Sequence, residues 1–162
     1  MLVYRVAHSK HIADLAGTGG LYTSGRWHAL GTRILYTSGT LSLAKLEVLA
    51  NSLITPIRQA LLILEIPDDL PPAELNIADL PAQWKNYPAP NELISLAADW
   101  IRQNQHLVLK VPSAQAELEF NYLINPLHPS HHRLQIVEIR PQHFDPRLKE
   151  RAFGPLSTGH SP

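Results

Sequence analysis

Proline placement constrains the fold of this chain more than any other feature of its sequence. The chain has 14 prolines in 162 residues, and nearly all of them fall between short apolar runs. Proline lacks a backbone N–H donor and restricts the residue before it, so strands and helices end close to it. The sequence therefore predicts a mixed α+β fold with several short strands and few long helices.

The apolar runs between these prolines predict where the elements lie. Strands are expected over residues 2–7, 33–37, 60–66, 106–111 and 134–139. Helices are expected over 9–15, 40–51 and 91–104, with Ser9, Thr40 and Asn91 as their N-caps. The helix over 40–51 is apolar nearly all round, so we expect it to be buried. The five glycines of 17–31 predict a long loop, and the Pro- and Asp-rich segment 67–87 is expected to cross the surface.

The length of the chain suits one domain, which we expect over residues 1–153, followed by a disordered tail over 154–162. The chain has no cysteine, which excludes disulfides, thiolate metal sites and a cysteine nucleophile and fits a reducing compartment. The N-terminal run is expected to form a strand and not a signal peptide, and no apolar stretch approaches the roughly 20 residues that span a bilayer. We therefore expect a cytoplasmic protein that does not bind membranes.

The charge balance bears on possible partners. Lys plus Arg number 14 and Asp plus Glu number 14, so the formal net charge is zero. Nucleic-acid binding depends on phosphate contacts from an excess of basic residues. We therefore expect no direct binding to nucleic acid.

Glu47 is the first candidate for chemistry. On the predicted helix its neighbours three and four positions away are mostly small or apolar. A carboxylate in such surroundings is costly to bury unless another group pairs with it. Two interpretations stay open: the carboxylate reaches solvent or pairs with a core arginine such as Arg5, or it is a catalytic group at the floor of a cleft.

Three further residues have both a structural and a functional interpretation. Arg26 lies in the glycine-rich loop, where a guanidinium can bind a phosphate in a bidentate manner. Trp27 beside it is more typical of a core residue than of a stacking platform. Tyr36 lies in a predicted strand, either as an ordinary half-buried aromatic or as a stacking face for a ligand ring.

Two other patterns do not support a site. The histidines His128, His131 and His132 cluster in a loop, but without cysteine or an H-E-x-x-H pattern they predict no metal site. The stretch Gly17-Thr-Gly-Gly follows a predicted helix and lacks the strand–G-x-G-x-x-G–helix context of a dinucleotide loop. Residue patterns alone thus indicate a globular domain with one unusual carboxylate and one loop arginine.

An ordered set of short motifs, however, resembles the RES domain, a family named for Arg, Glu and Ser. The matching pieces cover roughly residues 4–148. In chain order they are Tyr4-Arg5, Gly25-Arg26-Trp27 with Gly31, Leu35-Tyr36-Thr37, Leu43-Ala44, Glu47-Val48-Leu49, Leu109 to Ser113, Asn121 to Pro126, His128-Pro129 and Asp145-Pro146-Arg147-Leu148. One departure is visible: the family usually has Asn after Gly-Arg-Trp, where this chain has His28.

The resemblance implies a fold and a site. The fold would be similar to that of ADP-ribosyltransferases, with short twisted β-sheets around an NAD cleft and flanking helices. The family's functional positions correspond to Arg5, Arg26, Tyr36, Glu47 and Ser113, and Asn121 lies in a family motif. In this interpretation Glu47 supports the developing positive charge, Arg5 and Arg26 hold the pyrophosphate, Tyr36 stacks on nicotinamide and Ser113 contacts the adjacent ribose. No metal is implied.

The resemblance also implies an activity and partners. RES proteins are typically toxins of toxin–antitoxin pairs that degrade NAD by hydrolysis or phosphorolysis. The alternatives are ADP-ribosyl transfer to a protein and a catalytically silent fold that only binds its antitoxin. The expected partners are NAD and a helix-turn-helix antitoxin, with self-association as a further expectation whose interface the sequence does not identify.

Overall fold

The computed structural model describes residues 1–150, so the predicted tail over 154–162 lies outside the described residues. The strands are β1 (Leu2–His8), β2 (Leu35–Ser38), β3 (Gln59–Glu65), β4 (Ala73–Glu74), β5 (Val108–Pro112), β6 (Phe120–Ile124) and β7 (Gln135–Gln142). The α-helices are α1 (Leu41–Ala50), α2 (Asn91–Gln103) and the short α3 (Arg147–Glu150). Short 3₁₀ turns are η1 (Ser9–His11), η2 (Thr18–Leu21), η3 (Ile77–Asp79) and η4 (Pro129–Arg133). The predicted single α+β domain is confirmed.

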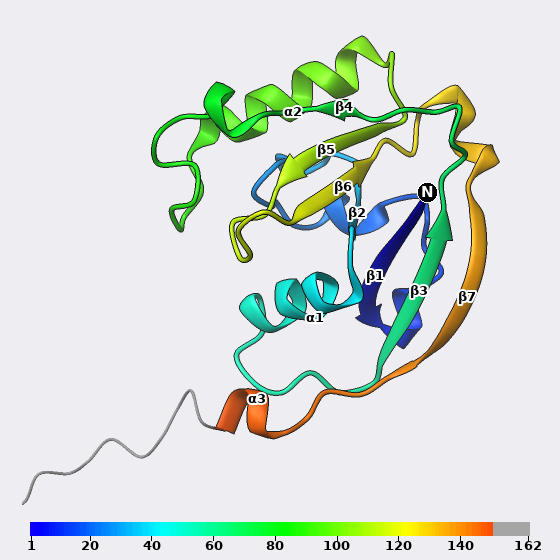
Figure 1. Ribbon diagram of the computed structural model, residues 1–162, viewed down its shortest axis with the longest axis vertical. Helices are drawn as coiled ribbons and strands as arrows, with labels where there is room; N and C mark the ends of the chain where they lie inside the picture. Colours follow the sequence, from blue (N-terminus) through cyan, green and yellow to red (C-terminus); the bar gives the residue numbers. More distant parts are fainter. Residues whose placement is uncertain (151–162) are drawn as a thin grey trace, which may run out of the picture.

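The seven strands form one mixed sheet in the order β4-β5-β6-β2-β1-β3-β7 (Figure 1). The sheet narrows in the middle, because β1 and β2 share a single register pair, Tyr4 with Ser38. On either side the pairing is more extensive, with seven pairs between β1 and β3 and four between β2 and β6. The sheet therefore consists of two short halves that meet at β1 and β2, and α1 packs against both of these strands.

One hydrophobic cluster lies between α2 and one half of the sheet, and a second cluster spans both halves. Helix α2 buries Leu93, Ala97 and Trp100 in a cluster with Leu109 of β5 and Leu123 of β6. The other half is built on β3, whose leucines alternate between two clusters, as the period of two in a strand requires. None of the helices in residues 1–150 is long and apolar enough to cross a membrane.

The strands predicted from apolar runs are all present, but β4 and β6 were not predicted. The run Phe-Asn-Tyr-Leu-Ile of β6 carries the β-prone pattern that would have identified it. The segment 67–87 is also more structured than the predicted surface crossing. It contributes β4, which pairs in parallel with β5, and it buries Leu80 and Trp84 against α2 and β5.

Two of the predicted helix starts were wrong in detail. The helix predicted over 9–15 is only the 3₁₀ turn Ser9–His11, and its N-cap is His8, whose imidazole accepts a hydrogen bond from Lys10 N. Asn91 is the first residue of α2 and not its cap; Pro90 holds that position without a side-chain bond. Each of these two elements therefore has its N-cap one residue earlier in the chain than predicted.

Helix α1 begins as predicted but is not buried as predicted. Thr40 Oγ1 accepts a hydrogen bond from Leu43 N at 3.1 Å, which confirms the N-cap. Only Leu43 and Ala44 are buried, however, and Leu46 is 39% exposed. The helix packs against β1, β2 and Phe144, and its remaining side meets solvent. This arrangement gives Glu47 an accessible position on a helix that the sequence had suggested was enclosed.

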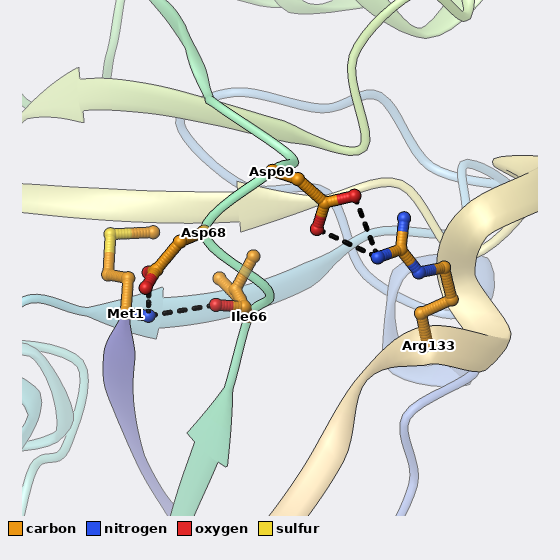
Figure 2. A network of polar contacts seen from close by, with 5 residues as sticks. All are labelled: Met1, Ile66, Asp68, Asp69 and Arg133. Carbon is orange, nitrogen blue, oxygen red and sulfur yellow. Dashed lines mark hydrogen bonds and ion pairs between the residues drawn. The ribbon is translucent and has the colours of Figure 1, made fainter.

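A network of polar contacts fixes the chain where it leaves β3 toward β4 (Figure 2). The N-terminal amine of Met1 donates to the carbonyl of Ile66 at 2.8 Å and to the carboxylate of Asp68 at 2.7 Å. Arg133 in η4 donates to both carboxylate oxygens of Asp69, at 2.7 and 2.9 Å. These contacts tie the connection between the two halves of the sheet to the N-terminus and to η4.

Candidate active site

The Glu47 carboxylate is held by two side chains from the sheet. Its Oε1 accepts a hydrogen bond from Asn121 Nδ2 at 2.6 Å and another from Ser113 Oγ at 3.2 Å. Asn121 lies on β6, and Ser113 is the first residue after β5. Both partners are buried, whereas Glu47 is half-buried. The carboxylate therefore sits at a boundary between the protein interior and solvent, in a fixed orientation.

Both partners of Glu47 are themselves held in place. Asn121 Oδ1 accepts a bond from Ser38 Oγ at 2.7 Å, across the register pair that joins β2 to β6. Ser113 Oγ also accepts bonds from the backbone N–H groups of Gln115 and Ala116, at 3.0 and 3.2 Å. With its other contacts made, the Ser113 hydroxyl donates its single proton to Glu47. The two donors are thus oriented by the sheet and the following turn.

The second oxygen of the carboxylate, Glu47 Oε2, forms no hydrogen bond or ion pair within residues 1–150. Since Oε1 receives both bonds, Oε2 is the carboxylate oxygen that keeps its hydrogen-bonding capacity free among the described residues. Arg26 lies near enough to feel the charge of this carboxylate: burial lowers the pKa of Arg26, and the negative charge of Glu47 acts in the opposite direction. A carboxylate with one anchored and one open oxygen can support positive charge on a bound molecule.

Arg26 also anchors the segment after η3. Its Nη1 donates to the carbonyl oxygen of Trp84, and to that of Asn86 at 3.2 Å. Trp84 is buried beside α2, and Trp27 next to Arg26 is buried in the same cluster, which confirms Trp27 as a core residue. The guanidinium is thus held by backbone carbonyls from one side, with Glu47 and Tyr36 close enough to affect its pKa.

Tyr36 is fixed through its hydroxyl group. The hydroxyl oxygen accepts a bond from Trp27 N at 3.2 Å and lies 2.8 Å from His28 Nδ1. The other ring nitrogen of His28, Nε2, lies 3.0 Å from the carbonyl oxygen of Thr23. Burial raises the pKa of Tyr36, with the nearby Glu47 adding to the effect, so the phenol stays neutral at physiological pH.

A cavity of about 260 Å³ opens beside Tyr36. Its lining includes Arg5, Asp14, His28 and Tyr36 together with glycines of the loop over 17–31. Arg5 was expected to pair with a buried acid such as Glu47, but it faces Asp14 and donates from Nη1 to the Asp14 carbonyl oxygen at 3.2 Å. Burial lowers the pKa of Arg5, while the Asp14 charge acts against this. The cavity therefore presents one desolvated guanidinium that a bound anion would stabilise.

The three clustered histidines have partners of their own. The His128 imidazole accepts a bond from Ser130 N, and the rings of His131 and His132 contact the carbonyl oxygens of Leu15 and Pro129. In the described part of the chain, no group of three or more His, Asp or Glu residues is placed to hold a metal.

The candidate residues thus fall into two adjoining groups. Glu47, Ser113 and Asn121 are joined by hydrogen bonds, with Arg26 beside them, and Arg5 lines the cavity. Tyr36 belongs to both, because it lines the cavity and its pKa responds to Glu47. Sequence reasoning missed Ser38, Asp14 and the contact that His28 makes. The first two carried no local signal, whereas His28 stood out as a departure from a motif.

Comparison with known protein families identifies the family to which this chain belongs. The model of the RES domain matches residues 2–146, which is most of the chain. The chain belongs to the RES domain family. The Arg, Glu and Ser candidates that carried the resemblance all lie within the matched residues.

Two relatives illustrate what is known of this family. The RES chain is 35% identical over 143 residues to the "Prs ADP-ribosylating toxin" of a Sphingobium species, covering 86% of this chain and 89% of that protein. It is 36% identical over 151 residues to "Toxin Res" of Pseudomonas putida, covering 90% and 97%. These relatives match nearly end to end and are named as toxins.

A solved structure supports the fold. The RES chain resembles the crystal structure of the M. tuberculosis MbcT–MbcA toxin–antitoxin complex with a TM-score of 0.67 at 16% identity. The match covers 93% of this chain and 87% of that one. At this identity the likeness establishes the shared architecture, in agreement with the predicted fold class.

Proposed function

We propose that this RES protein is the toxin of a toxin–antitoxin pair and consumes NAD by cleaving its nicotinamide–ribose bond. The observation that carries the proposal is the Glu47 carboxylate, anchored through Oε1 by Asn121 and Ser113 with Oε2 open. The names of its relatives support the toxin role. The family's resemblance to ADP-ribosyltransferases supports NAD as the substrate.

The chemistry suits a positioned carboxylate better than a strong acid. When the bond between the ribose anomeric carbon and the nicotinamide nitrogen breaks, both electrons go to nitrogen, and nicotinamide leaves as a neutral molecule. The sugar carbon develops oxocarbenium character, as in glycoside cleavage. An oxygen of water or phosphate then bonds to that carbon, and water gives up a proton. Glu47 Oε2 would stabilise the developing positive charge and accept hydrogen bonds from the ribose hydroxyls.

The other residues would bind and orient NAD. Arg26 and Arg5 supply the two guanidiniums for the pyrophosphate, and Tyr36 between them supplies the ring for nicotinamide. The side chains of Ser113 and Asn121 both donate hydrogen bonds to Glu47, so their contribution is to fix the carboxylate, with Ser113 close to the bound ribose. Arg26 would exchange at least one of its carbonyl contacts for phosphate.

The proposal is tested by incubating the purified chain with NAD, with and without phosphate, and following nicotinamide by proton NMR. Nicotinamide release that requires phosphate indicates phosphorolysis, and release without it indicates hydrolysis. Glu47→Gln keeps the size of the side chain and removes its charge, so turnover should fall by about 100-fold or more. Unchanged turnover in Glu47→Gln would overturn the role given to this carboxylate.

ADP-ribosyl transfer to a protein is the second candidate. It is favoured by the 35% identity to a relative named as an ADP-ribosylating toxin. The bond-breaking step would be the same, and only the group that captures the ribose carbon would differ. A mass increase on a target protein incubated with NAD and the toxin would support transfer, whereas free ADP-ribose or its 1-phosphate would support NAD consumption.

The proposed partner is a helix-turn-helix antitoxin. The support is the fold shared with a toxin solved as a toxin–antitoxin complex. A silent RES fold that only binds an antitoxin is the remaining alternative, and it predicts no nicotinamide release under any condition. The complete set Arg5, Arg26, Tyr36, Glu47 and Ser113 argues against it, since binding an antitoxin does not require these residues together.

A further inference from the structure

We infer that His28 is a positioning residue of this site. Its Nδ1 accepts a hydrogen bond from the Tyr36 hydroxyl and so holds that hydroxyl in place. Nothing in the family resemblance assigns this role, since the family usually has Asn at the position. The role in turnover rests on the proposed function, whereas the contact itself is testable without any substrate.

The direction of each hydrogen bond follows from the atoms involved. The Thr23 carbonyl oxygen, 3.0 Å from His28 Nε2, can only accept, so Nε2 carries a proton. A neutral imidazole with its proton on Nε2 has a lone pair on Nδ1. The Tyr36 hydroxyl, 2.8 Å from Nδ1, therefore donates to it while accepting from Trp27 N. The phenol has no rotational freedom left in this arrangement.

The glycine-rich loop is shaped around this imidazole. A Cβ at Gly25 would lie 2.7 Å from His28 Cε1 and 3.0 Å from the Tyr36 hydroxyl, and one at Gly20 would lie 3.2 Å from the imidazole and 2.0 Å from the Thr32 carbonyl oxygen. The 2.7 Å distance is shorter than Cβ contacts in proteins allow and the 3.0 Å distance is tight, so a side chain at Gly25 would force His28 or Tyr36 to move. His28 is also buried, with only 6% of the residue exposed. The loop composition thus serves to enclose His28 against Tyr36.

Protonation of His28 would reverse the contact with Tyr36. An imidazolium carries a proton on Nδ1, which would donate to the phenol oxygen and turn the Tyr36 O–H toward the cavity. The charged groups that face this part of the site are Arg5 and Asp14 in the same cavity, with Arg26 and Glu47 acting on Tyr36. Burial lowers the pKa of His28 more than its bond to Thr23 raises it, which maintains the neutral form at neutral pH.

The first test uses NMR of the free protein, with ¹³C at Cζ of tyrosine and ¹⁵N in histidine. The chain has five tyrosines, and Tyr36→Phe assigns the signal of interest. We expect the ¹⁵N shifts to show His28 protonated on Nε2, and the Tyr36 signal to shift in one step below about pH 6.5, the ordinary value for histidine. The step should be absent in His28→Asn. A proton on Nδ1 at neutral pH, or the same step in His28→Asn, would overturn the inference.

The second test measures NAD turnover against pH. The wild-type chain should lose activity below about pH 6.5, and His28→Asn should lack that acid limb. His131→Asn is the matched control, because His131 also contacts a carbonyl oxygen through Nε2, at 3.0 Å, but does not line the cavity. An acid limb that persists in His28→Asn, or disappears in His131→Asn, would contradict the role.

A double-mutant cycle separates positioning from a general structural effect. His28→Leu should lower turnover by about tenfold in the wild-type background and by much less when Tyr36 is already Phe. Equal losses in both backgrounds would mean that His28 does not act through the hydroxyl. If the chain released no nicotinamide at all, the proposed function would fail, while the NMR result would still decide whether His28 holds Tyr36.

Discussion

Asn121 and Glu47, 74 residues apart in the chain, are joined by a hydrogen bond of 2.6 Å from the amide nitrogen to Oε1 of the carboxylate. The oxygen of the same side-chain amide accepts a hydrogen bond from Ser38 Oγ, so the orientation of the amide is determined by the pairing of β2 with β6. The position of the candidate catalytic carboxylate is therefore set by the sheet and not by helix α1 alone.

Asn121→Asp should strongly reduce activity at neutral pH while preserving the fold. The substitution keeps the shape of the side chain but replaces the donor to Glu47 with a carboxylate oxygen. Two adjacent carboxylates cannot both ionise easily, so the pair should retain a proton to higher pH. We expect NAD turnover at pH 7 to fall at least tenfold and to recover partly at pH 9. Asn91→Asp, at the exposed start of α2, is the control and should leave turnover unchanged.

Arg5→Met should weaken binding of the pyrophosphate while leaving the loop beside it in place. Methionine retains the apolar stem and removes the guanidinium that lines the cavity. Arg33→Met is a matched control, since Arg33 Nη1 also donates to a carbonyl of the segment that leads into the glycine-rich loop, Ala16 O at 3.2 Å, from outside the cavity lining. Calorimetric titration with ADP-ribose should give about tenfold weaker binding for Arg5→Met. Equal weakening in both variants would assign the effect to the loop.

Thr40→Ala should destabilise the protein by about 1 kcal/mol through loss of the N-cap of α1. Thr40 Oγ1 accepts from Leu43 N at 3.1 Å and donates to Glu119 Oε2 at 2.6 Å, so the substitution also frees the turn before β6. Urea unfolding followed by circular dichroism measures the change. Thr40→Ser keeps the oxygen and should recover most of the stability; a serine variant as unstable as the alanine one would argue against capping.

His28 should make the protein less stable in mild acid. Because burial lowers its pKa in the folded state below the value of about 6.5 in the unfolded chain, the unfolded chain binds more protons between the two values. The free energy of unfolding should therefore fall as pH decreases from about 6.5 through the folded-state pKa. The urea midpoint at pH 5.5 relative to pH 7.5 should drop less in His28→Asn than in the wild-type chain. Identical drops would exclude this contribution.

Features that depend on neighbouring residues could be predicted from the sequence. The apolar runs identified five strands because alternation and proline boundaries are local signals, and Thr40 was recognisable as a cap because its bond spans three residues. The RES family was recognisable because its motifs occur in a fixed order along the chain. These observations together predicted the α+β class and the candidate site residues.

The tertiary structure decided which groups meet. Ser113 and Asn121 reach Glu47 only because β5, β6 and β2 lie side by side in a sheet whose order differs from the order in the chain. The exposure of α1 likewise depends on how it packs against the sheet. The contacts of Arg5 with Asp14 and of His28 with Tyr36 span only nine and eight residues, but they depend on how the intervening turn and loop fold. Periodicity and capping report contacts within a few residues, so a carboxylate's partners 66 and 74 residues away become visible only once the sheet is formed.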